Sequence, residues 1–268
     1  MIEMPPKAVM WHDLSAISWR GTLTEMLHPL PWLILSIWLY ASPAFWLAPP
    51  VSFMFFLCAL RLNHEAIHSN LGLSRTWDSV ILTTLSVLML GSNHSVAIGH
   101  LKHHKNTLGP EDFEGKCGDM SLCQVLFYGP KFPIDLLRHA WRTGNWRWRR
   151  RIMADLIAIA MFLAFVAWAD VAALWWHVGA MALAQCMTAF FAVWITHQGS
   201  RDAGIVARSQ RGPLAWLAYM MFYHREHHLF PKVPVSQLPR LARRLDQTVP
   251  GYAASHRPVV PFLEPRKT

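Results

Sequence analysis

The amino-acid sequence predicts an all-α integral membrane fold: four transmembrane helices in two hairpins, further helices at the interface, and a cytosolic cap rich in histidine. Three observations favour this fold. Apolar residues make up 53% of the 268 residues, long apolar runs alternate with polar stretches, and no Lys or Arg occurs in residues 30–60 or 152–200. Such a composition is typical of membrane proteins, and basic residues confined to the polar stretches mark the cytosolic side.

The first hairpin is expected at residues 30–47 and 51–68. Pro31 and Pro43 are expected to kink or shorten its first span, and Ala48-Pro49-Pro50 indicates a tight turn between the spans. The second span continues helically through His64 and His68. Because two spans return the chain to its starting side, we expect these histidines at the cytosolic edge.

The second hairpin is expected at residues 152–169 and 171–195, around Asp170. Residues 80–90 are apolar but too short to cross a bilayer, which takes about 20 residues. We therefore expect them to lie at the interface or to enter the membrane and return. The basic run of residues 147–151 is predicted to anchor the second hairpin on the cytosolic side, and residues 214–222 form another short apolar piece.

These elements predict a single domain over residues 1–268, with both termini in the cytosol and, for a bacterial chain, a place in the inner membrane. The net charge of +9 comes from clusters in the polar stretches. A nucleic-acid partner is therefore not expected, because the charge follows the membrane topology.

Three histidine clusters lie at the edges of apolar stretches. Residues three or four apart share one face of a helix, so each cluster presents two or three imidazoles in one direction. Imidazole is the commonest metal ligand in proteins, and one metal rarely takes more than four protein ligands. Eight histidines thus predict two metals: His64-Glu-Ala-Ile-His68, His100-Leu-Lys-His103-His104 and His224-Arg-Glu-His227-His228.

Other residues near the clusters have two interpretations each. His197 ends the last span at the depth of the clusters, so it is either a further ligand or an interfacial cap. His94 lies off the face of the second cluster and is expected to be structural or to support a ligand. Glu65 and Glu226 are expected either to hydrogen-bond the second nitrogen of a ligand or to pair with the neighbouring Arg61 and Arg225.

All-imidazole coordination suits iron, copper, zinc or nickel. Two neighbouring metals with open positions favour the activation of O₂. The clusters resemble those of the membrane fatty acid desaturase and hydroxylase superfamily, above all in Tyr223-His-Arg-Glu-His-His-Leu-Phe-Pro231 and Gly99-His-Leu-Lys-His-His-Lys105. The resemblance covers nearly the whole chain. It implies two irons held by nine histidines, namely His64, His68, His100, His103, His104, His197, His224, His227 and His228.

One position departs from the resemblance. Some members carry an Asn one turn before the histidine that corresponds to His197, where it holds an iron-bound water, whereas this chain has Val193. The chain also resembles the carotenoid ketolases and hydroxylases, which share the clusters. Desaturation of a fatty acyl chain is therefore the expected reaction, with hydroxylation or ketone formation on a lipid or carotenoid as the alternative.

Two rival functions compete with this interpretation. His64-Glu65-Ala-Ile-His68 is an HExxH motif, the signature of zinc proteases, but a third ligand would have to come from Asp155 or Asp170, neither of which lies near the motif. A metal transporter or haem carrier would need a polar path across the membrane, and the spans provide few polar residues.

The resemblance implies O₂ as co-substrate and an external electron donor. The sequence has no cysteine cluster, flavin fingerprint or cytochrome-like segment that would supply electrons. An acidic donor such as a ferredoxin would suit the basic cytosolic face formed by Arg138, Arg142, Arg147 and Arg149. Attraction of this face to anionic lipid is the alternative.

Overall fold

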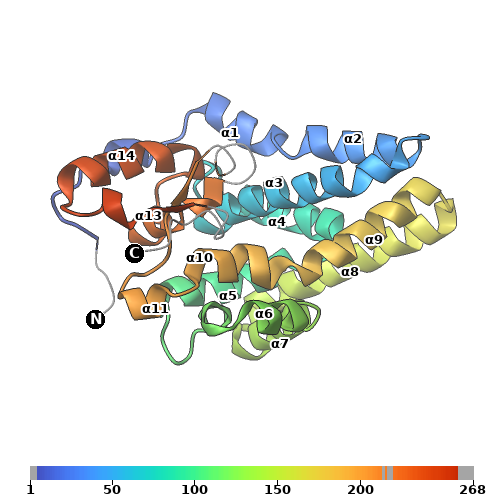
Figure 1. The fold of residues 1–268 in the computed structure, drawn as a ribbon. Helices are drawn as coiled ribbons and strands as arrows, with labels where there is room; N and C mark the ends of the chain where they lie inside the picture. The colour runs from blue at the N-terminus through green and yellow to red at the C-terminus, as the bar shows by residue number, and fades with distance from the viewer. Residues whose placement is uncertain (1–4, 213–214, 216–219, 259–268) are drawn as a thin grey trace.

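Helices dominate the computed structural model, which describes residues 5–212, 215 and 220–258. The long helix α3 (Ala48–His68) packs against α2 (Leu30–Tyr40) and α9 (Ala172–Cys186), and a second long helix, α8 (Trp146–Ala169), leads into α9 (Figure 1). The short helices α13 (His224–Leu229) and α14 (Leu238–Thr248) gather at one end of this bundle. The predicted helical fold is confirmed. Of the short apolar piece expected at residues 214–222, residues 214 and 216–219 lie outside the described residues.

Within the described part of the chain, three helical segments are long and apolar enough to span a membrane: residues 45–68, 146–169 and 172–203. A fourth is obtained if α4 (Arg75–Met89) and α5 (Asn93–Lys105), which meet at 114°, form one broken span. Residues 80–90 were expected not to cross the membrane by themselves, and this agrees with the structure, in which they end at the bend between α4 and α5. The sharp turn is made at Leu90, whose φ of 57° places it in the left-handed region.

The helix of the expected first span, residues 30–47, is shortened, as its prolines predicted. α2 ends at Tyr40, and a separate turn of 3₁₀ helix, η2 (Phe45–Leu47), leads directly into α3. The expected turn at Ala48-Pro49-Pro50 is wrong, because both prolines lie in the first turn of α3. Proline lacks the N–H that is unpaired there anyway, and its fixed φ suits a helix start.

The third span begins earlier than expected, at Trp146 instead of residue 152. The Asn145 side chain accepts hydrogen bonds from the backbone N–H groups of Arg147 and Trp148 and so caps the helix. The basic run is therefore the first turn of α8. The fourth span is interrupted: a π-helical segment, η4 (Ala189–Trp194), separates α9 from α10 (Ile195–His197).

Large apolar side chains cover the outer surface of the bundle. Ile34, Met161, Trp168 and Leu183 are between 67% and 81% exposed. A soluble monomer rarely exposes apolar residues on this scale, whereas lipid covers them at no cost. Inside the bundle, α3 packs against α2, α4 and α9, and its inner residues Phe55, Phe56 and Ala59 are fully buried.

The remaining elements connect the bundle to the end where the histidines lie. They are α1 (Trp19–Leu27), η1 (His12–Leu14), η3 (Gly115–Asp119), α6 (Leu122–Tyr128), α7 (Phe132–Thr143), α11 (Ser200–Ala203), η5 (Met220–Phe222), η6 (Val235–Gln237) and η7 (Ala253–Ser255). Strands β1 (Gln210–Arg211) and β2 (Arg257–Pro258) pair in parallel, Gln210 with Arg257.

His94, on α5, hydrogen-bonds to residues of α4 and α8. Its Nδ1 lies 2.9 Å from Asp155 Oδ1, and its Nε2 lies 2.8 Å from Ser79 Oγ. The same carboxylate accepts hydrogen bonds from Thr83 and Ser92. This network ties α4 and α5 to α8, so the structural interpretation of His94 is the one that its contacts support.

Candidate metal centre

Nine histidines converge at the end of the bundle beside α13, in two groups. Within each group, one ring nitrogen of every member lies within 4.8 Å of the others. Group A contains His64, His68, His100, His104 and His227. Group B contains His103, His197, His224 and His228. These are the nine histidines that the sequence singled out, and each is buried or nearly so.

Helical spacing explains how the residues divide between the groups. His64 and His68 lie one turn apart at the end of α3 and both enter group A. On α5, His100 and His104 enter group A, whereas His103 points into group B. On α13 the division is reversed: His224 and His228 enter group B and His227 enters group A. Neighbouring residues on a helix diverge by about 100°, so adjacent histidines serve different groups.

The distances within the groups fit metal coordination. Imidazole nitrogens lie about 2.0–2.1 Å from a metal such as zinc, so two of them at right angles around one ion are about 3.0 Å apart. In group A, His227 Nε2 lies 2.9 Å from the Nε2 atoms of His64 and His104. In group B, His197 Nε2 lies 3.0 Å from the Nε2 atoms of His103 and His224. Each group can therefore surround one ion.

The hydrogen bonds of two group B rings leave their Nε2 atoms in a form that can bind a cation. His103 Nδ1 lies 2.7 Å from Asp112 Oδ2, and His197 Nδ1 lies 3.1 Å from the carbonyl oxygen of Val206. A carboxylate and a carbonyl only accept, so both Nδ1 atoms carry the proton. The two Nε2 atoms then face each other with lone pairs at 3.0 Å. A metal ion between them turns this repulsion into coordination.

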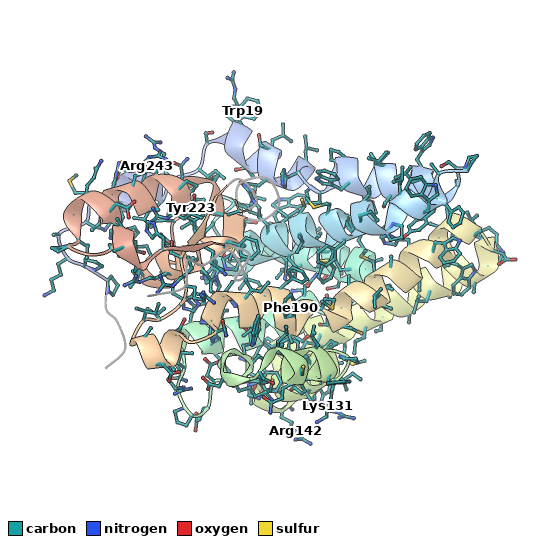
Figure 2. All side chains as sticks on the ribbon, viewed as in Figure 1. Trp19, Lys131, Arg142, Phe190, Tyr223 and Arg243 are labelled. Atoms are coloured by element: carbon teal, nitrogen blue, oxygen red, sulfur yellow. The ribbon has the colours of Figure 1, made fainter. Side chains whose placement is uncertain are left out.

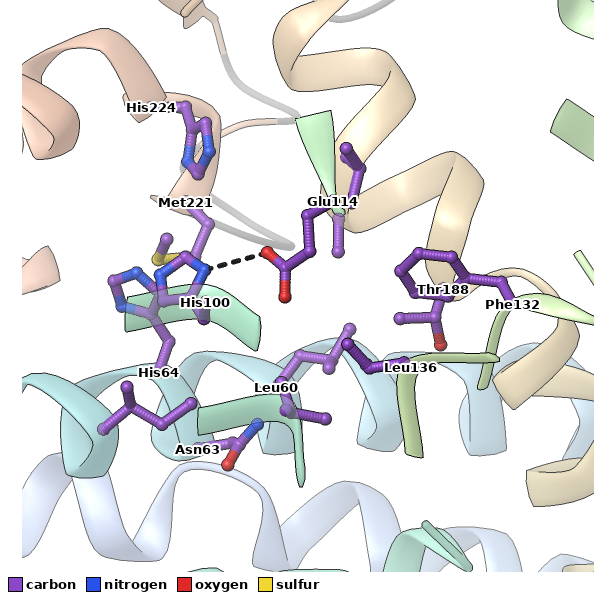
Figure 3. Close-up of a pocket in the computed structure, with 14 residues that line it drawn as sticks. Leu60, Asn63, His64, His100, Glu114, Phe132, Leu136, Thr188, Met221 and His224 are labelled. Atoms are coloured by element: carbon purple, nitrogen blue, oxygen red, sulfur yellow. Dashed lines mark hydrogen bonds and ion pairs between the residues drawn. The ribbon is translucent and has the colours of Figure 1, made fainter. Parts of the chain in front are cut away.

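Two acidic residues that sequence analysis missed support the ligands. Asp112 accepts from His103, as above, and from the backbone N–H groups of Leu108 and Gly115 at 2.8 and 2.9 Å. Burial raises the pKa of Asp112, but its hydrogen bonds with His103 and the backbone outweigh burial, so the pKa is lowered overall. Glu114 Oε2 lies 3.3 Å from His100 Nδ1 (Figure 3). The acid-rich stretch of residues 111–114, directly after the second cluster, was the available signal.

Glycines make room for these acidic residues. A Cβ on Gly115 would lie 2.1 Å from Asp112 Oδ2, and a Cβ on Gly99 would lie 2.8 Å from Glu114 Oε1. Gly118 is similarly close to His197, since its Cβ would lie 2.9 Å from the histidine Cβ. The loop between α5 and α6 can therefore press its backbone and carboxylates against the histidines.

The expected roles of Glu65 and Glu226 are corrected. Glu65 accepts from the backbone N–H of Val235 at 3.0 Å, and its distance of 3.6 Å from His64 Nδ1 is too long for a hydrogen bond. Glu226 accepts from Ser209 and Arg211 at 2.7 and 2.8 Å. Both glutamates thus fasten the C-terminal segment to the histidine helices.

The arginine partners expected for them are also wrong. Arg61 pairs with Glu25 on α1, at 2.5 and 2.8 Å. Arg225 donates to Ser255 and lies over the ring of Tyr252. These contacts brace α1 and the C-terminal segment around the centre. They leave both glutamates to the partners described above.

Burial keeps the α13 imidazoles neutral. It lowers the pKa of His224, His227 and His228 well below the ordinary value, and the neighbouring histidines lower each pKa further. A neutral imidazole has a free lone pair, which is the form that binds a metal. At neutral pH these three rings are therefore ready to act as ligands.

A cavity opens beside both groups. Figure 3 shows His64, His100 and His224 on one side of it and apolar side chains such as Leu60, Phe132 and Leu136 on the other. Val193, the position at which the sequence departs from its resemblance, also lines this metal-side cavity. The cavity therefore combines candidate metal ligands with an apolar wall, as an aliphatic substrate requires.

Comparison with known proteins identifies the family. The sequence pattern described as fatty acid desaturase matches residues 37–259. The chain belongs to the fatty acid desaturase family. The expected resemblance to this family is confirmed.

The chain is also similar in sequence to one characterised desaturase, at low identity. The chain is similar to the sphingolipid delta(4)-desaturase DES1 of Drosophila melanogaster, with 26% identity over 216 residues, 75% of this chain and 66% of the relative. The matched part thus spans just under two thirds of the relative's length. No solved structure matches the chain.

Proposed function

We propose that this protein is an O₂-dependent, non-haem di-iron desaturase that inserts a double bond into the aliphatic chain of a lipid. The observation that carries the proposal is the division of nine imidazoles, seven of them buried, into two groups beside one cavity with an apolar wall. The name of the Drosophila relative makes a sphingolipid one candidate substrate class. Residues 1–268 would form a single domain.

The proposed ligands are the members of the two groups: His64, His68, His100, His104 and His227 for one iron, and His103, His197, His224 and His228 for the other. When bound, the two irons would supply the redox chemistry that reduces O₂ and removes hydrogen from an unactivated carbon. Asp112 and Glu114 would hold the ligand rings in orientation. The apolar wall of the metal-side cavity would position the chain, which is the main contribution of geometry to such reactions.

The reaction needs electrons from outside the chain. Two hydrogens leave neighbouring carbons, and two electrons with two protons complete the reduction of O₂ to two waters. We propose an acidic donor of the ferredoxin type, docking on the basic face formed by Arg138, Arg142, Arg147 and Arg149. All four are exposed, on α7 and the first turn of α8, and Figure 2 shows Arg142 pointing away from the bundle.

We also propose that the histidine end and both termini face the cytosol. The basic residues of α7 and the first turn of α8 lie toward this end, whereas the turn between α8 and α9 carries none. In this orientation α2 with α3, and α8 with α9, would form the two hairpins.

Hydroxylation or ketone formation on a lipid or carotenoid is the alternative outcome of the same site. It would follow if oxygen were transferred to the substrate carbon in place of removal of a second hydrogen. The zinc protease alternative has less support, because Glu65 accepts a hydrogen bond from Val235 and is fully buried. Asp155, one of the two span carboxylates considered as a third ligand, is occupied by His94, Thr83 and Ser92.

The test combines metal analysis with lipid profiling of cells that express the protein. We expect two irons per chain and new unsaturated lipids, and we expect His227→Ala to lose the group A iron and the new lipids. His12→Ala is the matched control, because this exposed histidine contacts Trp11 and lies in neither group. Oxygenated lipids or carotenoids in place of unsaturated ones would select the alternative, and a single zinc per chain would refute the di-iron centre.

A further inference from the structure

Thr107 lies two residues beyond the end of α5 and contacts histidines of two different helices. Its side chain is buried, with 4% exposed. The hydroxyl donates a hydrogen bond to the backbone carbonyl of His103, on α5, at 2.8 Å. Thr107 Oγ1 also lies 3.3 Å from Nδ1 of His228, on α13. Thr107 therefore bridges two helices that carry candidate metal ligands.

The hydroxyl of Thr107 determines where the proton of His228 lies. A threonine hydroxyl has one hydrogen and two accepting lone pairs. The carbonyl oxygen of His103, at 2.8 Å, is its nearest acceptor, since the carbonyl of His104 is 3.4 Å away. With the hydroxyl hydrogen used in this way, Nδ1 of His228 must donate to the hydroxyl oxygen. The lone pair of the ring is then on Nε2, which lies 3.1 Å from His224 Nε2 in group B.

Packing alone does not orient the His228 ring. It stacks on His104, a group A residue, with ring centroids 4.2 Å apart and an interplanar angle of 17°. Stacking fixes the plane of an imidazole, but it does not select which edge of the ring faces the metal. The hydrogen bond with Thr107 makes that selection, because it engages Nδ1 and leaves Nε2 for group B. In a buried site such a bond is stronger than at the surface.

The same arrangement recurs at two other rings of group B. Asp112 accepts from Nδ1 of His103, and the carbonyl of Val206 accepts from Nδ1 of His197. Partners of this kind fix the tautomer and the orientation of a ligand and so raise its affinity for the metal. The residue after Thr107 takes part as well, since the backbone N–H of Leu108 donates to Asp112 at 2.8 Å. Residues 107–108 thus support two group B ligands from one short segment.

We propose that Thr107 is a positioning residue of the metal centre: its hydroxyl accepts the Nδ1 proton of His228 and directs Nε2 of that ring to the group B metal. Thr107 acts through His228 and is not itself a ligand. The inference rests on the proposed function and adds to it a residue outside the three histidine clusters.

Competition with a chelator, applied to the purified, iron-loaded protein in detergent, tests this role. Thr107→Val keeps the shape of the side chain and removes the acceptor of the His228 Nδ1 proton. We expect the iron affinity of group B to fall about tenfold, at the lower end of the range that is typical for such partners, because the bond of 3.3 Å is long. Thr107→Ser keeps the hydroxyl and should retain both irons. If Thr107→Val does not fold, Thr107→Ala replaces it with the same expectation.

Thr143→Val is the matched control. Thr143 donates to the carbonyl of His139, four residues earlier, at 2.8 Å, just as Thr107 donates to His103. It is exposed, and no imidazole nitrogen among the described residues bonds to its hydroxyl. This variant is expected to retain both irons. Equal iron loss in Thr143→Val and Thr107→Val, or an unchanged iron affinity in Thr107→Val, overturns the proposal.

A double variant separates the contact with His228 from the bond to the carbonyl of His103. In a His228→Ala background, Thr107→Val is expected to cause no further loss of iron affinity in group B, because the ring through which Thr107 acts is absent. An equal loss in both backgrounds would assign the effect to the His103 carbonyl and would overturn the proposal.

Mössbauer spectra of the iron-loaded protein provide a readout that a general loss of stability does not change. Two iron signals are expected in the wild type, because five imidazoles surround one site and four surround the other. With iron in excess, Thr107→Val should shift one signal and leave the second unchanged. Wild-type protein with fewer than two irons would refute the di-iron centre and this inference with it. Two irons whose signals are both unaffected by Thr107→Val would refute the positioning role alone.

Discussion

Replacing Asp112 with Asn is expected to weaken metal binding in group B and to leave metal binding in group A unchanged. The carboxylate accepts three hydrogen bonds, from His103 Nδ1 and from the backbone N–H groups of Leu108 and Gly115. An amide has a single accepting oxygen, so at least one of these donors would face its NH₂ group. Loss of such a hydrogen-bonding partner typically costs 10–100-fold in metal affinity. This corresponds to about 1.4–2.8 kcal/mol, confined to group B because His103 belongs to it.

The assay is competition with a chelator, followed by elemental analysis of the protein. Wild-type protein is expected to keep two metals per chain at a chelator concentration at which Asp112→Asn keeps one. His68→Ala weakens group A alone, so the double variant should lose both metals. Asp119→Asn is the control, because this half-exposed carboxylate lies in the same loop and pairs with Arg201 at 3.1 Å. The reasoning fails if Asp112→Asn loses both metals together, or if Asp119→Asn behaves in the same way.

Three further predictions follow from the geometry. Gly115→Ala should reproduce the metal loss of Asp112→Asn, because its Cβ would lie 2.1 Å from the carboxylate; unchanged chelator resistance would count against the close approach. Asp155→Ala should lower the free energy of unfolding by about 1–3 kcal/mol for each donor left unpaired, while elemental analysis still finds two metals; loss of metal would instead make Asp155 part of the centre. The metal-free protein should lose thermal stability as the pH falls below about 6.5, because the unfolded chain then binds protons that the folded chain excludes at His224, His227 and His228. A melting temperature that is constant between pH 7 and pH 5 would contradict the last expectation.

Periodicity revealed much of the candidate site. The spacings at His64 and His68, and in the two later clusters, place imidazoles on one helical face without knowledge of the fold. The convergence of His197 with them required the resemblance, because a lone histidine at a helix end gives no periodic signal. The assignment to groups was also out of reach of the sequence, since it depends on how α5 and α13 are rotated about their axes.

The supporting residues were hidden for a different reason. Asp112 lies in an irregular loop, where no repeat predicts the direction of a side chain. Glu65 and Glu226 lie next to the histidines in sequence, which suggested that they contact the ligands. On the helix, however, their side chains point away from the histidines, toward Val235 and Arg211. The start of α3 at Ala48 was missed because proline both ends helices and begins them, and the sequence alone did not say which applied at Pro49 and Pro50.

Shared helices make the two candidate metal sites mechanically dependent on each other. α5 and α13 each carry ligands for both groups, whereas α3 serves group A alone and α10 serves group B alone. A tilt of α13, which Glu226 links to Ser209 and Arg211, would disturb both ions at once. A molecule that docks on the C-terminal segment would thereby alter both candidate metal sites without touching a single proposed ligand.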